Sequence, residues 1–269
     1  MHDLSTFLRD LEPAVRFALA EDLGAGDVTA ALIPAAATAV ATIVLREPAI
    51  VCGRPWFDET FRQLDPAIET EWHVGEGSAQ PANTILCSLR GSARKLLSGE
   101  RTALNFLQTL SGTATLTRRY ADALTGYTTR ILDTRKTLPG LRLAQKYAVA
   151  RGGGTNHRLG LYDQVLLKEN HIAAAGSITL AVVRARTLYP TLLIEVETEN
   201  LHEFDEAVAT TADIIMLDDF SREDIATAVQ RNAGRKKLEI SGGVTLDNLR
   251  EFANLGVDFI SSGALTKDL

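Results

Sequence analysis

The chain has 269 residues, of which 45% are hydrophobic, and a formal net charge of −6, so it can bury a substantial core and lacks the basic balance of most nucleic-acid-binding domains. It contains no run approaching the ~18–20 apolar residues of a membrane-spanning helix, and its N-terminus has neither the cationic start nor the apolar stretch of a secretory signal. The two cysteines, Cys52 and Cys87, have neither zinc-binding spacing nor a disulfide pattern, which indicates buried thiols in a cytoplasmic protein.

The first 90 residues predict a small α+β layer. Apolar residues between Leu4 and Leu19 recur on one helical face, and Gly24 follows as a helix stop. Apolar or alternating runs at 39–51, 68–74 and 84–89 predict three strands, and residues 55–64 predict a short helix between the first two. This order of elements predicts a sheet that is covered on one face.

The segment from Ser92 to about residue 124 predicts helix, because its leucines recur at spacings of three, four and seven. We expect Ser111-Gly112 to interrupt it before a second helix at 113–124, and we place the domain boundary here, giving domains 1–110 and 111–269. Arg101 lies in the middle of the first helical stretch. Taken alone it would be a surface charge paired with Glu100 or another neighbour.

Beyond residue 130, apolar runs alternate with helical stretches. The runs begin near Ile131, Val165, Leu192, Ile214, Leu238 and Phe259. Helical stretches at 177–189, 202–211 and 245–256 separate several of them, and this alternation requires a parallel sheet with right-handed crossovers. Six clear repeats, with room for a seventh, favour a closed or nearly closed barrel over an open doubly wound sheet, and no GxGxxG motif opens the first repeat.

The segment from Arg130 to Ile172 is strongly basic within this acidic chain. It contains eight Lys or Arg residues and three Asp or Glu residues, a net charge of +5. Such a local pool of positive charge indicates a site for a small polyanion; the alternative is a solvated charged loop, but the charges directly follow two strands of buried character. The three glycines at 152–154 fit a flexible turn and a close approach of backbone to a ligand equally well.

Side chains at the carboxyl ends of barrel strands converge on one mouth, where the active sites of such barrels lie. In chain order these ends supply Arg135 and Lys136, Lys168, Glu195 and Glu197, Asp218 and Asp219, Ser241 with Gly242 and Gly243, and Ser262 with Gly263. The early cations suit an anionic co-substrate, while the late glycine turns suit the phosphate of a phosphorylated sugar. The Glu197 and Asp218 carboxylates suit either a hydrated Mg²⁺ ion or the hydroxyls of a ribose.

Several of these residues allow another interpretation. We expect only one of Glu195 and Glu197 to face the mouth, and we choose Glu197 because it lies nearer the strand end. Lys168 could instead be a Schiff-base lysine, and His157 alone could be structural. Asp219 and Asn200 are expected to be helix caps or rim residues.

Motifs along nearly the whole chain resemble the quinolinate phosphoribosyltransferase family. They are EDLGAGDVTAALIP, GRPWFDETF, ERTALNFLQTLSGTAT, DTRKT, GGG with the following HR, LLKENHI, IEVETEN, IIMLDDFS, EISGGV and SSGALT. The resemblance implies an α/β protein: an N-terminal α+β open-faced sandwich followed by an incomplete β/α barrel of about seven strands. It also implies a homodimer in which the N-terminal domain of one subunit caps the barrel mouth of the other; whether dimers assemble into a hexamer stays open. The family pattern usually continues with a further C-terminal segment beyond the GALTKDL at which this chain stops.

The activity implied by this resemblance is the transfer of phosphoribosyl from phosphoribosyl pyrophosphate to quinolinate with decarboxylation. The products are nicotinate mononucleotide, pyrophosphate and CO₂, made in de novo NAD synthesis in the cytoplasm, with Mg²⁺, no organic prosthetic group, and neither nucleic acid nor membrane as a partner. The implied quinolinate-binding residues are Arg101, reaching the partner's site, with Arg135, Lys136, His157, Arg158 and Lys168. The implied phosphoribosyl-binding residues are Glu197, Asp218, Ser241, Gly242, Gly243, Ser262 and Gly263. The resemblance makes Lys136, Lys168, Glu197 and Asp218 the catalytic candidates, and it implies that Glu197 and Asp218 also hold the Mg²⁺ ion, directly or through water.

The residue types suit this chemistry because two polyanions repel each other and need a cluster of cations to meet at reacting distance. Positioning and charge would then carry the rate, and we expect no dedicated general base. Two alternatives remain at this point: a related phosphoribosyltransferase acting on another anion, such as a paralogue associated with molybdenum transport, and a ligand sensor without catalysis.

Overall fold

The computed structural model describes residues 3–268, and these residues form two compact units. The first unit comprises residues up to 118 together with 138–153, and the second comprises 119–137 together with the residues from 154 onward. The division therefore differs from a single boundary at 110. Residues 138–153 return to the first unit, where Tyr147 makes ring contacts with Phe7 and Trp56.

The first unit combines helices with short antiparallel strands. Its elements are α1 (Leu4–Leu8), α2 (Leu11–Leu23), the 3₁₀ turn η1 (Ala30–Leu32), β1 (Thr38–Val44), β2 (Ala49–Ile50), α3 (Arg54–Leu64), β3 (Glu69–Trp72), β4 (Ala79–Gln80), β5 (Ile85–Ser92), α4 (Ala93–Ala123) and α5 (Arg142–Gly152). Two predicted elements are divided in the structure: the first helix becomes α1 and α2, and the run at 39–51 becomes β1 and β2.

The main sheet of this unit has the order β1-β5-β3 and is antiparallel, with Thr38 opposite Ser92 and Glu69 opposite Arg90. Alternate residues of β1 are exposed, including Val40 at 65%, so one face of the sheet stays open as predicted. The other face packs on helices through a cluster of buried residues: Val51, Phe57, Phe61, Leu86, Cys87, Leu89, Leu96, Ala103 and Leu107. Cys52 and Cys87 are both buried free thiols.

Helix α4 runs without a break for 31 residues, so the predicted interruption at Ser111-Gly112 is wrong. A glycine inside a helix destabilises it by about 1 kcal/mol relative to alanine. Burial of the apolar side chains on either side stabilises the helix by more than that. Leu107, Leu110 and Ala114 are all buried here. Ser111 is also fixed in place, since its Oγ accepts from the Cys52 amide and donates to the Cys52 carbonyl.

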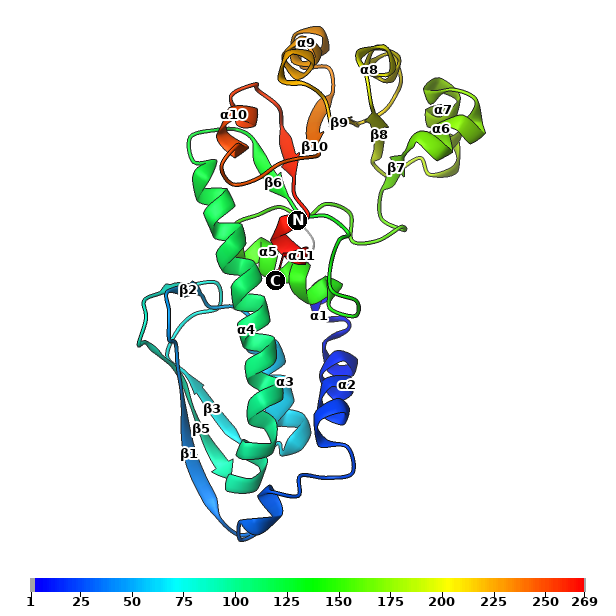
Figure 1. Ribbon diagram of the computed structural model, residues 1–269. Helices are drawn as coiled ribbons and strands as arrows, with labels where there is room; N and C mark the ends of the chain where they lie inside the picture. The colour runs from blue at the N-terminus through cyan, green and yellow to red at the C-terminus, as the bar shows by residue number, and fades with distance from the viewer. Residues whose placement is uncertain (1–2, 269) are drawn as a thin grey trace. The chain divides into compact units, whose positions relative to one another are not determined.

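The second unit is built on alternating strands and helices (Figure 1). Its elements are β6 (Arg130–Leu132), β7 (Val165–Leu167), α6 (Glu169–Ala175), α7 (Ile178–Leu188), β8 (Ile194–Thr198), α8 (Leu201–Val208), β9 (Ile214–Asp218), α9 (Arg222–Asn232), β10 (Lys237–Ser241), α10 (Leu249–Ala253), β11 (Phe259–Ser261) and α11 (Ala264–Lys267). All six predicted apolar runs form strands. Figure 1 shows helices α7, α8 and α9 next to one another, outside strands β8 and β9.

The six strands make one parallel sheet in the order β6-β11-β10-β9-β8-β7. The two outer strands, β6 and β7, are not hydrogen-bonded to each other in the described part of the chain, so the barrel is incomplete, as predicted. It has six strands rather than about seven. Asp218 of β9 is level with Ser241 of β10, which brings the carboxyl ends of neighbouring strands together.

Among residues 3–268, no helix is both long and apolar enough to cross a membrane.

Candidate active site

Cationic residues gather at the carboxyl ends of β6 and β7. Arg135 and Lys136 follow β6, Arg158 lies in the segment between the two strands, and Lys168 directly follows β7. Arg158 is only 9% exposed, and burial lowers the pKa of its guanidinium. The positive charge of Arg135 lowers the pKa of Arg158 further, while the charges of Glu195, Asp163 and Glu197 act in the opposite direction.

The segment carrying Arg158 is fastened at both ends by buried or half-buried aspartates. Asp133, which is fully buried just beyond β6, accepts from the backbone N–H of His157 at 2.8 Å and from the side-chain amide of Asn156 at 2.7 Å. On the other side, Asp163 accepts from the backbone N–H groups of Leu159 and Gly160. Hydrogen bonds to charged groups are stronger than neutral ones, so this segment is ordered before any ligand arrives.

Glu197 at the end of β8 contacts the ammonium group of Lys168. Their side chains are 12% and 45% exposed, respectively, so the pair lies at the rim of the barrel interior where solvent and ligand can reach it. A lysine held by a carboxylate does not offer a free amine, which disfavours the Schiff-base alternative.

Glu195 and Glu197 both face the barrel interior, so the expectation that one faces away is wrong. Residues two apart on a strand share a face. Glu195 lies one layer deeper than Glu197 and is fully buried, where it accepts from the Gln164 amide at 2.8 Å.

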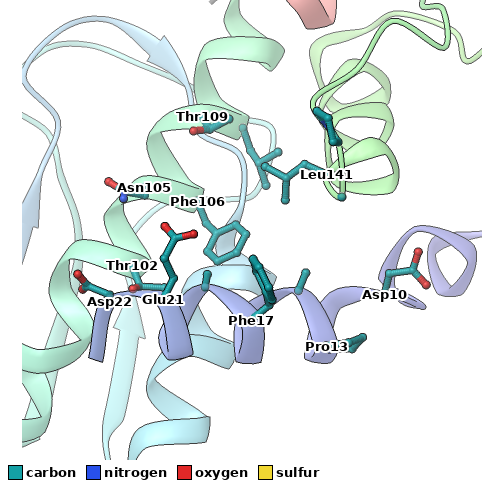
Figure 2. A pocket seen from close by; sticks show the side chains of 15 residues that line it. Asp10, Pro13, Phe17, Glu21, Asp22, Thr102, Asn105, Phe106, Thr109 and Leu141 are labelled. Carbon is teal, nitrogen blue, oxygen red and sulfur yellow. The ribbon is translucent and has the colours of Figure 1, made fainter. Parts of the chain in front are cut away.

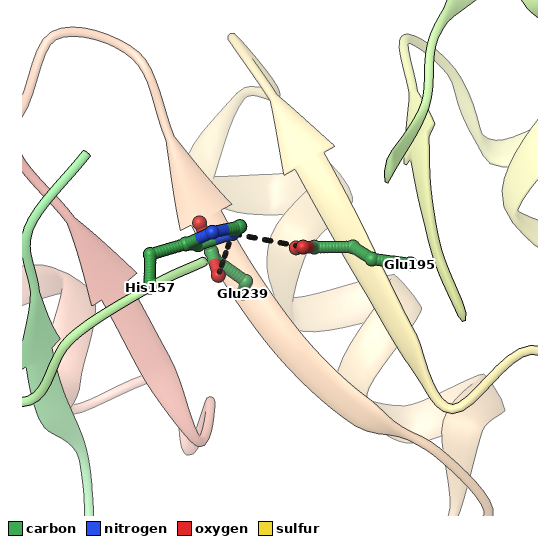
Figure 3. Close-up of side chains that lie close together, drawn as sticks. All are labelled: His157, Glu195 and Glu239. Atoms are coloured by element: carbon green, nitrogen blue, oxygen red, sulfur yellow. Dashed lines mark ion pairs between the residues drawn. The ribbon is translucent and has the colours of Figure 1, made fainter. Parts of the chain in front are cut away.

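The buried layer contains a third acidic group, Glu239 of β10, that sequence reasoning missed. His157 Nε2 lies 2.8 Å from Glu195 Oε2 and 3.6 Å from Glu239 Oε2 (Figure 3). Burial raises the pKa of Glu195 to about 7. Burial, and then the charge of Glu195, raises the pKa of Glu239 to about 8. The available signal was the register: Glu239 is level with Met216 of β9, which is itself level with Glu197.

His157 turns its ring toward these glutamates. Its Nδ1 accepts the backbone N–H of Arg158 at 2.8 Å while its Nε2 faces Glu195. The ring of His157 is thereby tied to the backbone of Arg158, the neighbouring cation.

A cavity of about 530 Å³ lies at the ends of β6, β10 and β11. Its lining includes Lys136 and the predicted small residues of the last two strand ends: Ser241, Gly242, Gly243, Ser262 and Gly263. Gly242 and Gly243 have φ values of +95° and +58°, which favour glycine. A side chain on Gly263 would come 2.9 Å from Lys136 Cδ, so that glycine makes room for the lysine.

Not every cation of the basic segment belongs to this mouth. Arg130 begins β6 and therefore lies at the opposite end of the strand. Arg142, Lys146 and Arg151 belong to α5 in the first unit, where Lys146 is fully buried and Arg151 lies over the Tyr147 ring at 4.9 Å. The net charge of the segment therefore overstates the charge of the site.

The triple glycine serves helix packing and helix termination. A Cβ on Gly152 would come 2.5 Å from the Ala114 carbonyl, so the close approach is to α4. Gly153 ends α5 with φ +95°. Asn200 caps α8 as expected by accepting the N–H groups of His202 and Glu203, and Asp219, expected as a cap or rim residue, has φ +52° and lies with its Oδ1 next to Gly242.

Two features of the first unit complete the picture. Arg101 is exposed on α4. A cavity of about 620 Å³ lies between α2, α4 and residues 139–141. Phe17, Phe106 and Leu141 are among the apolar side chains that line it (Figure 2). Its charged lining residues are Asp10, Glu21 and Asp22, so it does not suit a polyanion.

An incomplete parallel barrel with arginines, lysines and glycine turns at its carboxyl ends defines a barrel protein built to bind anionic, phosphorylated ligands. Comparison with known proteins gives the family. The C-terminal domain of quinolinate phosphoribosyl transferase matches residues 113–269, and its N-terminal domain matches residues 27–111. The chain belongs to the quinolinate phosphoribosyl transferase family.

Individual relatives agree with this assignment. A probable nicotinate-nucleotide pyrophosphorylase [carboxylating] of Synechocystis sp. is 48% identical over 94% of this chain and 88% of its own length. The nicotinate-nucleotide pyrophosphorylase [carboxylating] of Mycobacterium leprae is 41% identical over 94% of this chain and 91% of its own. The solved structure of the nicotinate-nucleotide pyrophosphorylase from Francisella tularensis superposes with a TM-score of 0.93 at 47% identity, covering 96% of this chain and 92% of that one.

Proposed function

We propose that this chain transfers phosphoribosyl from phosphoribosyl pyrophosphate to the ring nitrogen of quinolinate and releases pyrophosphate and CO₂, leaving nicotinate mononucleotide for NAD synthesis. The observation that carries the proposal is the pairing, in one barrel mouth, of Arg135 and Arg158 with a glycine-lined cavity that also contains Lys136. The first feature suits a dicarboxylate and the second a phosphorylated sugar. The names of the 39–48% identical relatives support the choice of substrates.

Quinolinate is assigned to the cations. Arg135 and Arg158 can each fork onto a planar carboxylate, and Lys168 adds a point charge at the end of β7. Arg101 is assigned to the site of the partner in a homodimer, which would place its exposed guanidinium over the second carboxylate. His157, whose ring accepts the backbone N–H of Arg158, is assigned to the same dicarboxylate.

The sugar diphosphate is assigned to the opposite side of the mouth. The 5-phosphate would lie in the cavity formed by Ser241, Gly242, Gly243, Ser262 and Gly263. Backbone N–H groups of such turns bind phosphate oxygens without a charged side chain. Lys136, which lines the same cavity, would neutralise the departing pyrophosphate.

The ribose is assigned to Glu197 and Asp218 at the ends of β8 and β9. As pyrophosphate leaves, the sugar carbon gains positive charge, and nearby carboxylates stabilise that charge electrostatically. Release of Glu197 from Lys168 would free one carboxylate for the sugar and one ammonium for an anion. Decarboxylation then needs no protein base, because the alkylated pyridinium ring itself accepts the electrons of the breaking bond, and the resulting C2 carbanion takes a proton from water.

A magnesium ion fits the same two carboxylates. Both are oxygen donors on adjacent strands, and Glu197 is partly accessible, which matches an ion that keeps several waters and shares its ligands with a diphosphate. Bound there, Mg²⁺ would neutralise charge on the pyrophosphate. We propose no organic prosthetic group, a cytoplasmic location, and neither nucleic acid nor membrane as a partner.

The test is to incubate the purified protein with quinolinate, phosphoribosyl pyrophosphate and Mg²⁺ and to follow nicotinate mononucleotide and ¹⁴CO₂ from carboxyl-labelled quinolinate. The proposal expects both products in equal amounts. Turnover only with another pyridine or anion would replace the substrate, and tight quinolinate binding with no CO₂ release would indicate a sensor. Omission of Mg²⁺ with chelator present should abolish turnover and be reversed by adding the ion.

A further inference from the structure

The backbone on both sides of the Lys136 side chain is hydrogen-bonded to a threonine hydroxyl. Thr134 Oγ1 accepts the backbone N–H of Lys136 at 3.0 Å, within the turn that follows β6. Thr266 Oγ1 donates to the backbone carbonyl of Lys136 at 2.7 Å, and Thr266 belongs to α11, 130 residues further along the chain. The proposed function assigns Lys136 to the departing pyrophosphate, so both bonds concern a residue of the chemistry.

The hydroxyl of Thr266 links a buried helix to an exposed lysine. Thr266 has 0% exposure and its neighbour Leu265 has 2%, so two consecutive buried side chains anchor α11. Lys136, in contrast, is exposed. A buried hydroxyl needs a hydrogen-bond partner to offset its desolvation, and the carbonyl of Lys136 accepts its proton. The bond therefore ties the backbone of the lysine to a fixed point of the fold.

Gly263, directly before α11, leaves room for the aliphatic part of the Lys136 side chain. A Cβ built on Gly263 would lie 2.9 Å from Lys136 Cδ and 3.6 Å from Lys136 Cβ, so the side chain runs along the backbone of this glycine. The φ of Gly263 is −68°, a value that any residue adopts. Space for the lysine, and not backbone conformation, is therefore what favours glycine at this position.

Lys136 is held differently from the other lysine of the same cavity. Among the described residues, Lys136 and Lys267 are the cations that line the cavity of about 530 Å³. Lys267 Nζ lies 3.3 Å from Asp268 Oδ1, and both of these side chains are more than half exposed, so this ion pair holds its lysine weakly. Lys136 instead has hydrogen bonds on both sides of its side chain and a packed aliphatic part.

A lysine loses rotamer freedom when its ammonium group binds an anion. Fixing the backbone and the aliphatic part in advance reduces that loss, and it places the charge before the reaction begins. We propose that Thr266 is a positioning residue, which aims the ammonium group of Lys136 at the pyrophosphate through its bond to the Lys136 carbonyl. This inference rests on the proposed function for the identity of that anion.

The kinetic test compares two substitutions at Thr266. Thr266→Val keeps the shape of the side chain and removes the hydroxyl, whereas Thr266→Ser keeps the hydroxyl. Misplacing a catalytic group by about 1 Å can lower a rate by about 100-fold, so Thr266→Val should lower kcat/KM for phosphoribosyl pyrophosphate by about tenfold or more. Thr266→Ser should stay within about threefold of the original value. The affinity for quinolinate alone, measured by calorimetric titration, should be unchanged in both variants.

A double-mutant cycle with Lys136→Ala separates positioning from a general effect on the fold. If Thr266 acts through Lys136, Thr266→Val should change kcat/KM by less than about twofold once the Lys136 side chain is absent. A loss of the same size in the Lys136→Ala background would overturn the proposal, because Thr266 would then act on another part of the site. An unchanged kcat/KM in folded Thr266→Val would overturn it as well.

Thr129→Val is the matched control. Thr129 is 5% exposed and its Oγ1 donates to the Val257 carbonyl, also at 2.7 Å, but it precedes β6 and therefore lies at the opposite end of that strand from the mouth. This substitution removes an equally buried hydroxyl and should leave kcat/KM unchanged. If Thr266→Val does not fold, Thr266→Ala, which lacks the same hydroxyl and is smaller, is measured instead and judged by the same outcomes.

A second measurement requires no turnover. Inorganic pyrophosphate with Mg²⁺ is titrated calorimetrically into the original protein, Thr266→Val, Lys136→Ala and the double variant. Each single substitution should weaken pyrophosphate binding by about fivefold or more, the scale of one hydrogen bond to a charged group, and the double variant should bind no more weakly than Lys136→Ala.

The two measurements distinguish the positioning role from the proposed reaction. The expected pattern of pyrophosphate binding without any quinolinate turnover would count against the proposed substrate and leave the role of Thr266 intact. Normal pyrophosphate binding by Thr266→Val, or no pyrophosphate binding by the original protein, would overturn the role of Thr266.

Discussion

Replacement of the buried acid Glu239 by glutamine should change how stability depends on pH. Burial, and then the charge of Glu195, raises the pKa of Glu239 from 4.5 to about 8 in the folded protein. The folded protein therefore retains a proton that the unfolded chain loses above about pH 4.5. Stability associated with Glu239 is fully present below pH 4.5, decreases as pH rises, and is lost once pH passes about 8.

The size of the effect follows from the width of that window. One pKa unit corresponds to about 1.4 kcal/mol. Between pH 5 and pH 7.5 the free energy of unfolding of the original protein should therefore fall by at most about 3 kcal/mol through Glu239. Glu195 shares the cluster, and its own pKa is raised to about 7, which divides the loss between the two groups. Glutamine cannot ionise. The free energy of unfolding of Glu239→Gln, taken relative to that of the original protein, should therefore rise by at least about 1 kcal/mol from pH 5 to pH 7.5.

Urea unfolding followed by circular dichroism at pH 5 and at pH 7.5 would measure this difference. Protein concentration must be held constant, because association would add its own term. Both tryptophans, Trp56 and Trp72, belong to the first unit, so tryptophan fluorescence would not report on the barrel that carries Glu239.

Glu223→Gln, at an exposed site on α9, provides the control and should show no such trend. A difference between Glu239→Gln and the original protein that stays constant from pH 5 to pH 7.5 would refute the assignment of a retained proton to Glu239.

Three further predictions concern the mouth and α4. Lys168→Ala should lower kcat by more than ~100-fold, the scale of losing one charge partner of a transition state. Lys237→Ala, at the opposite end of a barrel strand, is the control and should leave kcat unchanged. A kcat of Lys168→Ala equal to that of the original enzyme would show that Lys168 takes no part in the chemistry. Gly242→Ala should raise the KM for phosphoribosyl pyrophosphate by roughly tenfold, because its Cβ would lie 1.9 Å from Asp219 Oδ1. Gly234 also has a positive φ, but its Cβ would point into open space, so Gly234→Ala is the control and should leave that KM unchanged. Arg101→Ala should weaken quinolinate binding in a calorimetric titration by about tenfold or more, with no change in the sedimentation of the protein. Lys95→Ala on the same helix is the control. Normal quinolinate binding by Arg101→Ala would exclude the cross-subunit role.

The strand pattern of the barrel could be predicted because each strand is a short apolar run bounded by polar residues, and all of the runs from Ile131 to Phe259 are strands. Helix α5 was harder to foresee. Its sequence RLAQKYAVARG carries three cations, which made it resemble a charged loop, yet residues 143–149 are all buried against the first unit. Composition could not show that a helix with so much charge would be enclosed on most of its surface.

The positions of the site cations followed from chain order, since Arg135, Lys136 and Lys168 come directly after strands. The error at Glu195 came from applying strand alternation incorrectly, because residues two apart share a face. Glu239 gave no signal by itself, as a single glutamate within LEIS also fits an outward-facing position. The register of β8, β9 and β10 makes it level with Met216 and Glu197, and only the folded barrel brings its carboxylate to 3.6 Å from His157 Nε2.

The buried acids also explain how the mouth can keep two close arginines without a ligand. Burial and the charge of Arg135 both lower the pKa of Arg158, which measures the free energy needed to keep it charged there. The charges of Glu195, Asp163 and Glu197 act in the opposite direction. If these carboxylates lay at the surface, they would compete with an anionic substrate for the guanidinium of Arg158. Because Glu195 is fully buried and already accepts a side-chain N–H of Gln164, it can offset the charge of Arg158 from below while the outward side of the arginine stays available for a carboxylate.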